Sequence, residues 1–147
     1  MRTLRLLSFL LVLALGATSA RITAGDKEDD SKRLQGTWAV VSGEYAGKKD
    51  KELTDAKLVF DGEMFTLTTT TKIEKGRYRI DPANKPKQID LLHIQKDKVL
   101  VLGIYALDGD TLKICWHKES NPKVRPSEFA TKADSTLELM VLNRDKK

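Results

Sequence analysis

Cysteine is almost absent from this chain, which holds a single one, Cys115, among 147 residues. A disulfide within one chain is therefore excluded, and packing and hydrogen bonds alone have to hold the fold. Cys115 stands among apolar neighbours, where a small buried thiol is ordinary. A disulfide between two chains is the alternative, since odd cysteines in exported proteins sometimes pair in this way.

Histidine is nearly as scarce, with only His93 and His117. A zinc site needs three or four ligands, and only Cys115 could join these two histidines. The simpler interpretation places Cys115 in the core and the histidines at a rim. The Asp-Gly-Asp of residues 108–110 lacks the spacing of a calcium loop and reads as a turn. We therefore expect no metal site and no cofactor.

Catalytic motifs are missing as well. Ser42 and Ser127 lack a surrounding nucleophile motif, and no glycine-rich phosphate loop occurs. Glu44 and Asp90 lie in expected strands, but nothing in the sequence isolates either acid in an apolar pocket, as general acid catalysis requires. We expect no catalytic residue, and hence a protein that is not an enzyme.

No apolar run is long enough to span a bilayer, because residues 6–15 supply about ten apolar positions where ~20 are needed. Arg2 and Arg5 precede this run, and small residues at 16–20 follow it. This is the three-part pattern of a secretory signal peptide, so we expect residues 1–20 to be removed and the protein to be secreted or periplasmic. An uncleaved anchor is the less favoured alternative, and no stable membrane insertion is expected after cleavage.

Charge of one sign does not dominate the chain. Its net charge of +5 falls to +3 when Arg2 and Arg5 leave with residues 1–20. Lysines and acids alternate, as in residues 48–52, which is typical of a solvated loop and not of the clustered basic face of a nucleic-acid binder. We expect a monomer that does not bind nucleic acid.

The rest of the sequence favours short strands. Residues 21–33 form a charged leader, expected to be disordered over 26–30 and to make one helical turn at 30–34. Asp61-Gly62 and the turn at 108–110 join β-rich runs as hairpins. About eight strands predict an all-β fold, an antiparallel up-and-down barrel over residues 34–144, followed by a tail at 145–147. The expected strands cover residues 37–45, 57–60, 64–71, 74–80, 88–94, 99–107, 111–117 and 137–144.

Gly36-Thr37-Trp38 resembles the Gly-x-Trp of lipocalins, where it follows a short helical turn at the first strand. Arg144 resembles the arginine that packs over that tryptophan in lipocalins. Residues 34–38, 103–112 and 125–129 together resemble a small exported family of unassigned function that is abundant in planctomycetes. The resemblance implies a lipocalin-like barrel outside the cytoplasm and implies no activity. The domain is shorter than a usual lipocalin, and no helix is expected after the last strand.

A guanidinium over an indole face is a cation–π contact. We therefore expect Gly36, Trp38 and Arg144 to form a clasp that joins the first strand to the last. Loops as long as residues 118–136 are often lids or binding loops. In this loop, Arg125 and Glu128 would pair while Phe129 covers or plugs a barrel end.

Two functions fit these expectations. In the first, the barrel mouth holds a small apolar or amphipathic ligand, and Tyr78, Tyr105 and Trp116 are the aromatic residues expected to contact it. In the second, a barrel filled by side chains is a rigid platform or inhibitor that binds an envelope protein through an exposed apolar patch. Ligand binding is slightly favoured, and the two readings differ in whether the barrel interior is hollow.

Overall fold

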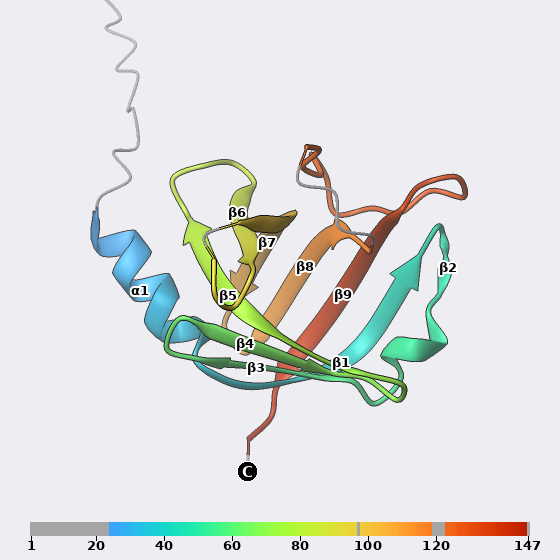
Figure 1. The fold of residues 1–147 in the computed structure, drawn as a ribbon, viewed down its shortest axis with the longest axis horizontal. Coiled ribbons are helices and arrows are strands. Elements are labelled where there is room, and N and C mark those ends of the chain that lie inside the picture. Colours follow the sequence, from blue (N-terminus) through green and yellow to red (C-terminus); the bar gives the residue numbers. More distant parts are fainter. Residues whose placement is uncertain (1–23, 97, 119–122, 147) are drawn as a thin grey trace, which may run out of the picture.

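The computed structural model describes residues 24–96, 98–118 and 123–146, so the predicted signal peptide lies outside the described residues. Strands dominate this part of the chain (Figure 1). The helices are α1 (Ala24–Leu34) and the 3₁₀ helix η1 (Lys51–Leu53). The strands are β1 (Gly36–Tyr45), β2 (Lys48–Lys49), β3 (Lys57–Asp61), β4 (Met64–Thr68), β5 (Ile73–Asp81), β6 (Lys87–Leu92), β7 (Val99–Asp108), β8 (Thr111–His117) and β9 (Leu137–Arg144).

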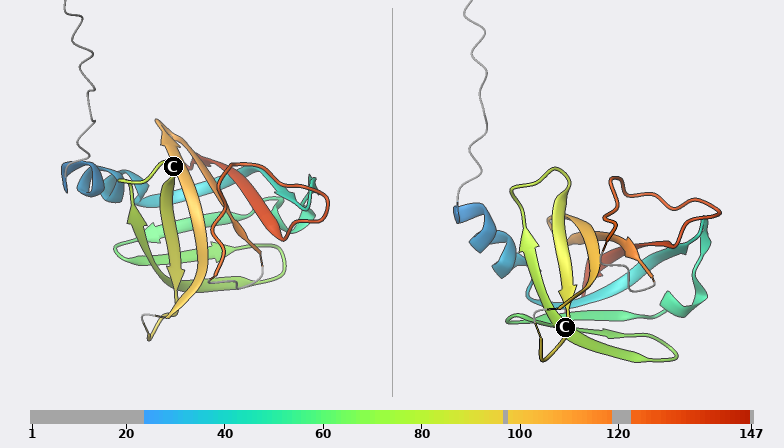
Figure 2. Two further views of the ribbon diagram at one scale, coloured as in Figure 1. Left: turned by 90° about the horizontal axis from the view of Figure 1, so that it is seen from above. Right: turned by 45° about the horizontal axis from the view of Figure 1, so that its top comes forward.

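The sheet closes on itself. From β3 to β9 each strand pairs antiparallel with the next, and β1 pairs with both β3 and β9. The seam between β1 and β9 runs from Trp38 opposite Arg144 to Tyr45 opposite Glu138, with one register shift between Val40 and Ser42. The predicted up-and-down barrel of eight strands is therefore confirmed, and β2 adds a short extra strand beside the end of β1 (Figure 2).

Alternating side chains fill the barrel. On β8, Leu112, Ile114 and Trp116 belong to the core, and on β9 Met140 and Leu142 continue it. The hairpin glycines Gly62 and Gly109 have φ of 58° and 55°, which glycine adopts without steric cost, so the chain reverses tightly at both Asp-Gly pairs.

The leader differs from the expectation. α1 spans eleven residues, where disorder over 26–30 and one helical turn were expected. The physical reason lies in its second half, which is bound to the barrel. Leu34 is fully buried, and the buried carboxylate of Asp30 accepts hydrogen bonds from Lys87 Nζ at 2.6 Å and from the Tyr105 hydroxyl at 2.7 Å. Tertiary contacts thus stabilise a helix whose apolar periodicity is weak.

One added strand and two strand ends also differ from the expectation by more than one residue. The expected loop after Tyr45 contains the short strand β2, and η1 follows it. The threonine run leaves the strand after Thr68, because Thr69 closes a turn by accepting the backbone N–H of Lys72 at 3.2 Å. β6 ends at Leu92, so His93 follows the strand, directly before the turn that begins at residue 94.

Arg144 lies over Trp38, as expected, with its guanidinium carbon 4.2 Å from the indole ring centroid. The same guanidinium donates to the backbone carbonyls of Gln35, at 2.9 Å, and of Arg33. The indole N–H of Trp38 donates to the carbonyl of Leu34 at 2.8 Å. Carbonyls at a helix C-terminus have no partner within the helix. The clasp therefore joins three parts of the chain, namely β1, β9 and the end of α1.

Gly36 lets the backbone turn from α1 into β1. Its φ is +104°, in a region that other residues adopt with strain. A Cβ at this position would also lie 3.7 Å from Nη1 of Arg144. The glycine of the Gly-x-Trp motif thus sets the direction in which the first strand leaves the helix.

The described part of the long β8–β9 loop, residues 123–136, is fixed to the barrel wall. The expected Arg125–Glu128 pair does not form, because Arg125 donates to the carbonyl of Gly103 and pairs with Asp90, both at 2.7 Å. Glu128 is exposed and lies 3.5 Å from Lys132. Asp90 alternates with the core residues Ile89 and Leu91, so Arg125 contacts the outer face of β6.

Replacement of Arg144 tests the clasp. Arg144→Ala removes a cation–π contact and two hydrogen bonds to the end of α1, so we expect the free energy of unfolding to fall by about 2–3 kcal/mol and the Tm by roughly 10 °C. Thermal unfolding followed by circular dichroism measures this. Lys113→Ala, at an exposed position on β8, is the control and should leave Tm unchanged. Equal transitions for both variants would contradict the clasp.

Candidate binding site in the barrel mouth

The two ends of the barrel differ. α1 lies at the end where β1 begins, and η1 lies at the opposite end (Figure 1). At the η1 end a half-enclosed cavity of about 250 Å³ enters the barrel, and we call it the mouth. Its apolar lining consists of Leu53, Phe65, Leu67, Leu91, Leu100, Val101 and Trp116. Its polar lining consists of Glu52, Thr69, Lys72, Glu74, Lys75, His117, Lys118 and Glu138.

Glu138 is the most buried charged group of the mouth, with a side chain only 6% exposed. It stands directly opposite Trp116 across β8 and β9, and its Oε2 accepts the indole N–H at 2.8 Å. Burial raises the pKa of Glu138 above its ordinary value, although the Trp116 hydrogen bond and the Lys118 charge act to lower it. The mouth therefore contains an acid that is reluctant to ionise.

Lys118 lies among three carboxylates, one of which is Glu138. Its Nζ lies 2.7 Å from Asp50 and 3.0 Å from Glu52, but 3.8 Å from Glu138. The ammonium also lies 4.8 Å from the centroid of the Tyr45 ring, within cation–π range. Partial burial by itself would lower the pKa of Lys118, but the hydrogen bonds to Asp50 and Glu52 raise it, so this lysine stays charged.

η1 brings Glu52 to the lining of the mouth, and Asp50, just before η1, contacts the lining residue Lys118. Asp50 caps η1 by accepting the backbone N–H of Glu52 at 2.9 Å. Leu53 packs directly on Gly43 of β1, where an added Cβ would lie 2.6 Å from the leucine side chain. Partial burial acts to raise the pKa of Asp50, but the hydrogen bond from Lys118 and that from the Glu52 backbone outweigh it and lower the pKa. The pKa of Asp50 is thus lowered from its ordinary value, whereas the pKa of Glu138 is raised.

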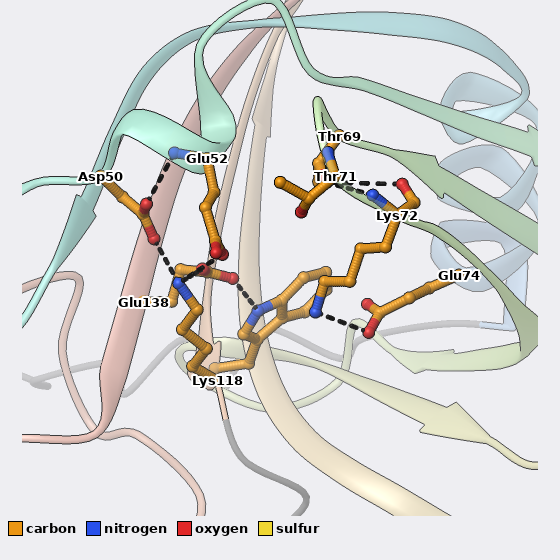
Figure 3. Close-up of polar contacts among 9 residues, drawn as sticks. Asp50, Glu52, Thr69, Thr71, Lys72, Glu74, Lys118 and Glu138 are labelled. Atoms are coloured by element: carbon orange, nitrogen blue, oxygen red, sulfur yellow. Dashed lines mark hydrogen bonds and ion pairs between the residues drawn. The ribbon is translucent and has the colours of Figure 1, made fainter.

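The facing wall carries a second ion pair. Lys72 Nζ donates to Glu74 at 2.9 Å, and both side chains are about half exposed. Figure 3 shows this pair on one side of the mouth and Lys118, between Asp50 and Glu52, on the other. The hydrogen bond to Glu74 raises the pKa of Lys72. Charged groups therefore ring an apolar interior.

The three aromatic residues expected at a ligand do not lie together, which corrects that expectation. Trp116 lines the mouth. Tyr105 is buried at the α1 end, where burial and its hydrogen bond to Asp30 raise the pKa of the phenol. Tyr78 donates to the carbonyl of Gly62 at 3.1 Å and accepts from Gln35 at 2.9 Å, so it holds the start of β1 to the β3–β4 turn.

Arg125, Glu128 and Phe129, the loop residues expected to form a lid or plug, are also absent from the mouth lining. Arg125 is bound to Asp90, and Glu128 is exposed. Phe129 is half-buried and lines a surface depression with Pro86, Tyr105 and Leu107. Within the described residues 123–136, this loop therefore neither covers nor plugs the mouth.

The candidate zinc ligands Cys115, His93 and His117 do not form a metal site with other described residues. The described residues contain no group of three or more His, Cys, Asp or Glu side chains able to hold a metal ion. His93 accepts the backbone N–H of Gln95, and Cys115 is fully buried. His117 lines the mouth with Nδ1 2.7 Å from the Thr136 hydroxyl, while its buried Nε2 has no hydrogen-bond partner among the described residues.

Glu138 was missed by the sequence reasoning, although a signal for it exists. It has the same phase as Met140 and Leu142 on β9, so strand alternation alone points it into the barrel. A charge on the inward phase of a strand breaks the apolar pattern and marks a position with a special role. Asp50, Glu52 and Lys118 offered no comparable signal, because all three stand in charged, loop-like stretches.

Comparison with protein-family models, with curated proteins and with solved structures found no match to this chain. Among the described residues, no helix has the length and apolar character needed to cross a membrane.

The raised pKa of Glu138 gives a test of the mouth by pH. A carboxyl whose pKa is higher in the folded chain costs no stability below its unfolded value of 4.5 and destabilises the fold as it ionises at higher pH. Glu138→Gln keeps an acceptor for Trp116 without the charge. We expect this variant to have a higher Tm than the unmodified chain at pH 7 and an equal Tm at about pH 4.

Glu128→Gln, the same change at an exposed site, is the matched control and should alter Tm at neither pH. A Glu138→Gln variant that is less stable than the unmodified chain at pH 7 would show that ionised Glu138 stabilises the fold, against this account.

Cys115 gives a second test. Burial raises the pKa of its thiol to about 11, so both access and thiolate formation are suppressed. We expect no reaction with a thiol reagent such as dithionitrobenzoate at pH 8 until a denaturant is added, and a single monomer band on a non-reducing gel. Rapid labelling of the native chain would contradict the burial.

Proposed function

We propose that this chain is an exported binding module whose barrel mouth takes one small amphipathic ligand. The cavity of about 250 Å³ at the η1 end is the observation that carries this proposal. Barrels of about eight strands are either filled by side chains or hold one small ligand. Ligand pockets commonly begin at roughly 300 Å³, so the occupant is at the small end of the range.

The lining of the mouth supports an occupant with two different parts. Phe65, Leu67 and Trp116 are buried and apolar, and they offer contact to a hydrocarbon or aromatic body. The charged groups stand around this apolar surface, on η1, β5, β9 and at Lys118. Such an arrangement, apolar walls with a few polar groups, is typical of small-molecule sites.

The alternative is a protein-interaction module with a completely filled barrel. The mouth cavity favours ligand binding over that alternative, because part of the interior is not occupied by side chains. Among the described residues the exposed large apolar side chains, Val41, Ile73, Ile94 and Val124, stand in four separate segments.

Export outside the cytoplasm is proposed from the sequence of residues 1–20, and membership of the lipocalin-like family from the motifs described above.

Filling the mouth tests the proposal. We expect the neutral fluorescent probe N-phenyl-1-naphthylamine to bind with saturable enhancement of its emission. Val101 lines the mouth, so Val101→Trp should fill it and weaken probe binding about tenfold or more. Val59→Trp, on the outer face of β3, is the matched control and should bind the probe normally.

Fluorescence titration at constant protein concentration measures both variants, with circular dichroism to verify that each is folded. Absence of saturable binding to the unmodified chain, or equal weakening by both substitutions, would contradict a ligand site in the mouth.

A further inference from the structure

We infer that the mouth selects ligands in which an apolar body carries a protonated amine, and that Glu138 accepts the hydrogen bond from that amine. The inference rests on the proposed ligand-binding function and adds the charge and the chemical class of the ligand.

The solvent exposure of each charged side chain determines how strongly it acts on a ligand in the mouth. The side chains of Lys72 and Glu74 are 46% and 49% exposed, so water and salt screen them. Lys75, also at the rim, is exposed. The side chains of Asp50 and Glu138, by contrast, are only 8% and 6% exposed. The least exposed charged group that lines the mouth is therefore the carboxylate of Glu138, and Asp50 is the buried acid beside it.

Of these two acids, Asp50 is already satisfied. Its two oxygens accept the backbone N–H of Glu52 at 2.9 Å and the ammonium of Lys118 at 2.7 Å. The same ammonium also reaches Glu52 at 3.0 Å, so Lys118 is held on the η1 side of the mouth. Lys118 and Asp50 consequently neutralise each other at hydrogen-bond distance.

Glu138 is less closely bound. Oε2 accepts from the indole of Trp116, whereas Oε1 has a long ion pair with Lys118 Nζ at 3.8 Å, and the nearby Asp50 carboxyl helps to raise the pKa of Glu138. A ligand donor that reaches Oε1 at hydrogen-bond distance would make a closer contact than this long ion pair does. An ammonium donor does so most strongly, because both partners of the hydrogen bond are then charged.

The surroundings of Glu138 suit such a group. The indole of Trp116 lies next to the carboxylate and also lines the mouth, where it can face a cation as well as an apolar chain. Phe65 and Leu67 contribute apolar wall for the rest of the ligand. A carboxylate ligand would instead place a second negative charge against Glu138, and like charges at close range oppose binding.

The test is displacement of bound N-phenyl-1-naphthylamine at pH 7 by octylamine, octanol and octanoate, which share a chain and differ in the head group. We expect octylamine to displace the probe at a concentration about tenfold lower than octanol, and octanoate to be the weakest. In Glu138→Gln, the roughly tenfold advantage of octylamine over octanol should disappear, so that both displace the probe at similar concentrations. Glu128→Gln, with the same loss of charge outside the mouth, should keep the order of the unmodified chain.

The outcomes separate the two proposals. If the probe binds and octanol or octanoate displaces it as well as octylamine does, the preference for an amine is wrong and the binding function stands. If octylamine keeps its advantage in Glu138→Gln, Glu138 is not the acceptor and the inference is overturned. If the probe does not bind at all, the proposed function itself fails.

Discussion

The contact between Arg144 and Trp38 is the constraint on which the rest of the structure depends. It lies where the first and last strands of the barrel meet, so it stabilises the pairing that turns an open sheet into a closed one. The same two side chains satisfy the carbonyls of Arg33, Leu34 and Gln35 at the end of α1. The same two side chains therefore contribute both to the closure of the barrel and to the docking of α1 at one of its ends.

The two ends contain buried acids that differ in their hydrogen bonding. At the α1 end, Asp30 is bound by Lys87, Tyr105 and, at 3.5 Å, Arg33, so the carboxylate holds the helix to the wall. At the mouth, Glu138 accepts a hydrogen bond from Trp116 and has a long ion pair with Lys118 at 3.8 Å. A buried acid with several short contacts is held in place, whereas one with fewer can accept a further donor. This contrast leads us to place the binding role at the mouth.

Much of this architecture could be predicted from sequence, because it follows from local rules. The Asp-Gly turns, the alternating strands and the Gly36–Trp38 motif are short-range signals, and Arg144 was found through its resemblance to the lipocalin arginine. The length of α1 could not be predicted, because its stability comes from Asp30 and Leu34 contacting distant strands. The partner of Arg125 was missed for the same reason, since Asp90 comes from a strand 35 positions earlier in the chain.

The site was harder to predict than the fold. Strand alternation places Tyr78, Tyr105 and Trp116 on the inside but does not say at which height in the barrel each one stands. Height follows from strand register, which places Trp116 opposite Glu138 and leaves both tyrosines at the α1 end. The charged ring of the mouth depends on η1, whose position is set by the packing of Leu53 on Gly43.

The two indole N–H groups report on the two ends of the barrel separately, because Trp38 donates to Leu34 beneath α1 and Trp116 donates to Glu138 in the mouth. A titration of the ¹⁵N-labelled chain with N-phenyl-1-naphthylamine, followed by two-dimensional NMR, therefore tests directly whether the mouth is the open and binding end. The account predicts that the indole resonance of Trp116 shifts progressively while that of Trp38 stays in place. A shift of Trp38 without Trp116, or no shift of either indole at saturating probe, would contradict it.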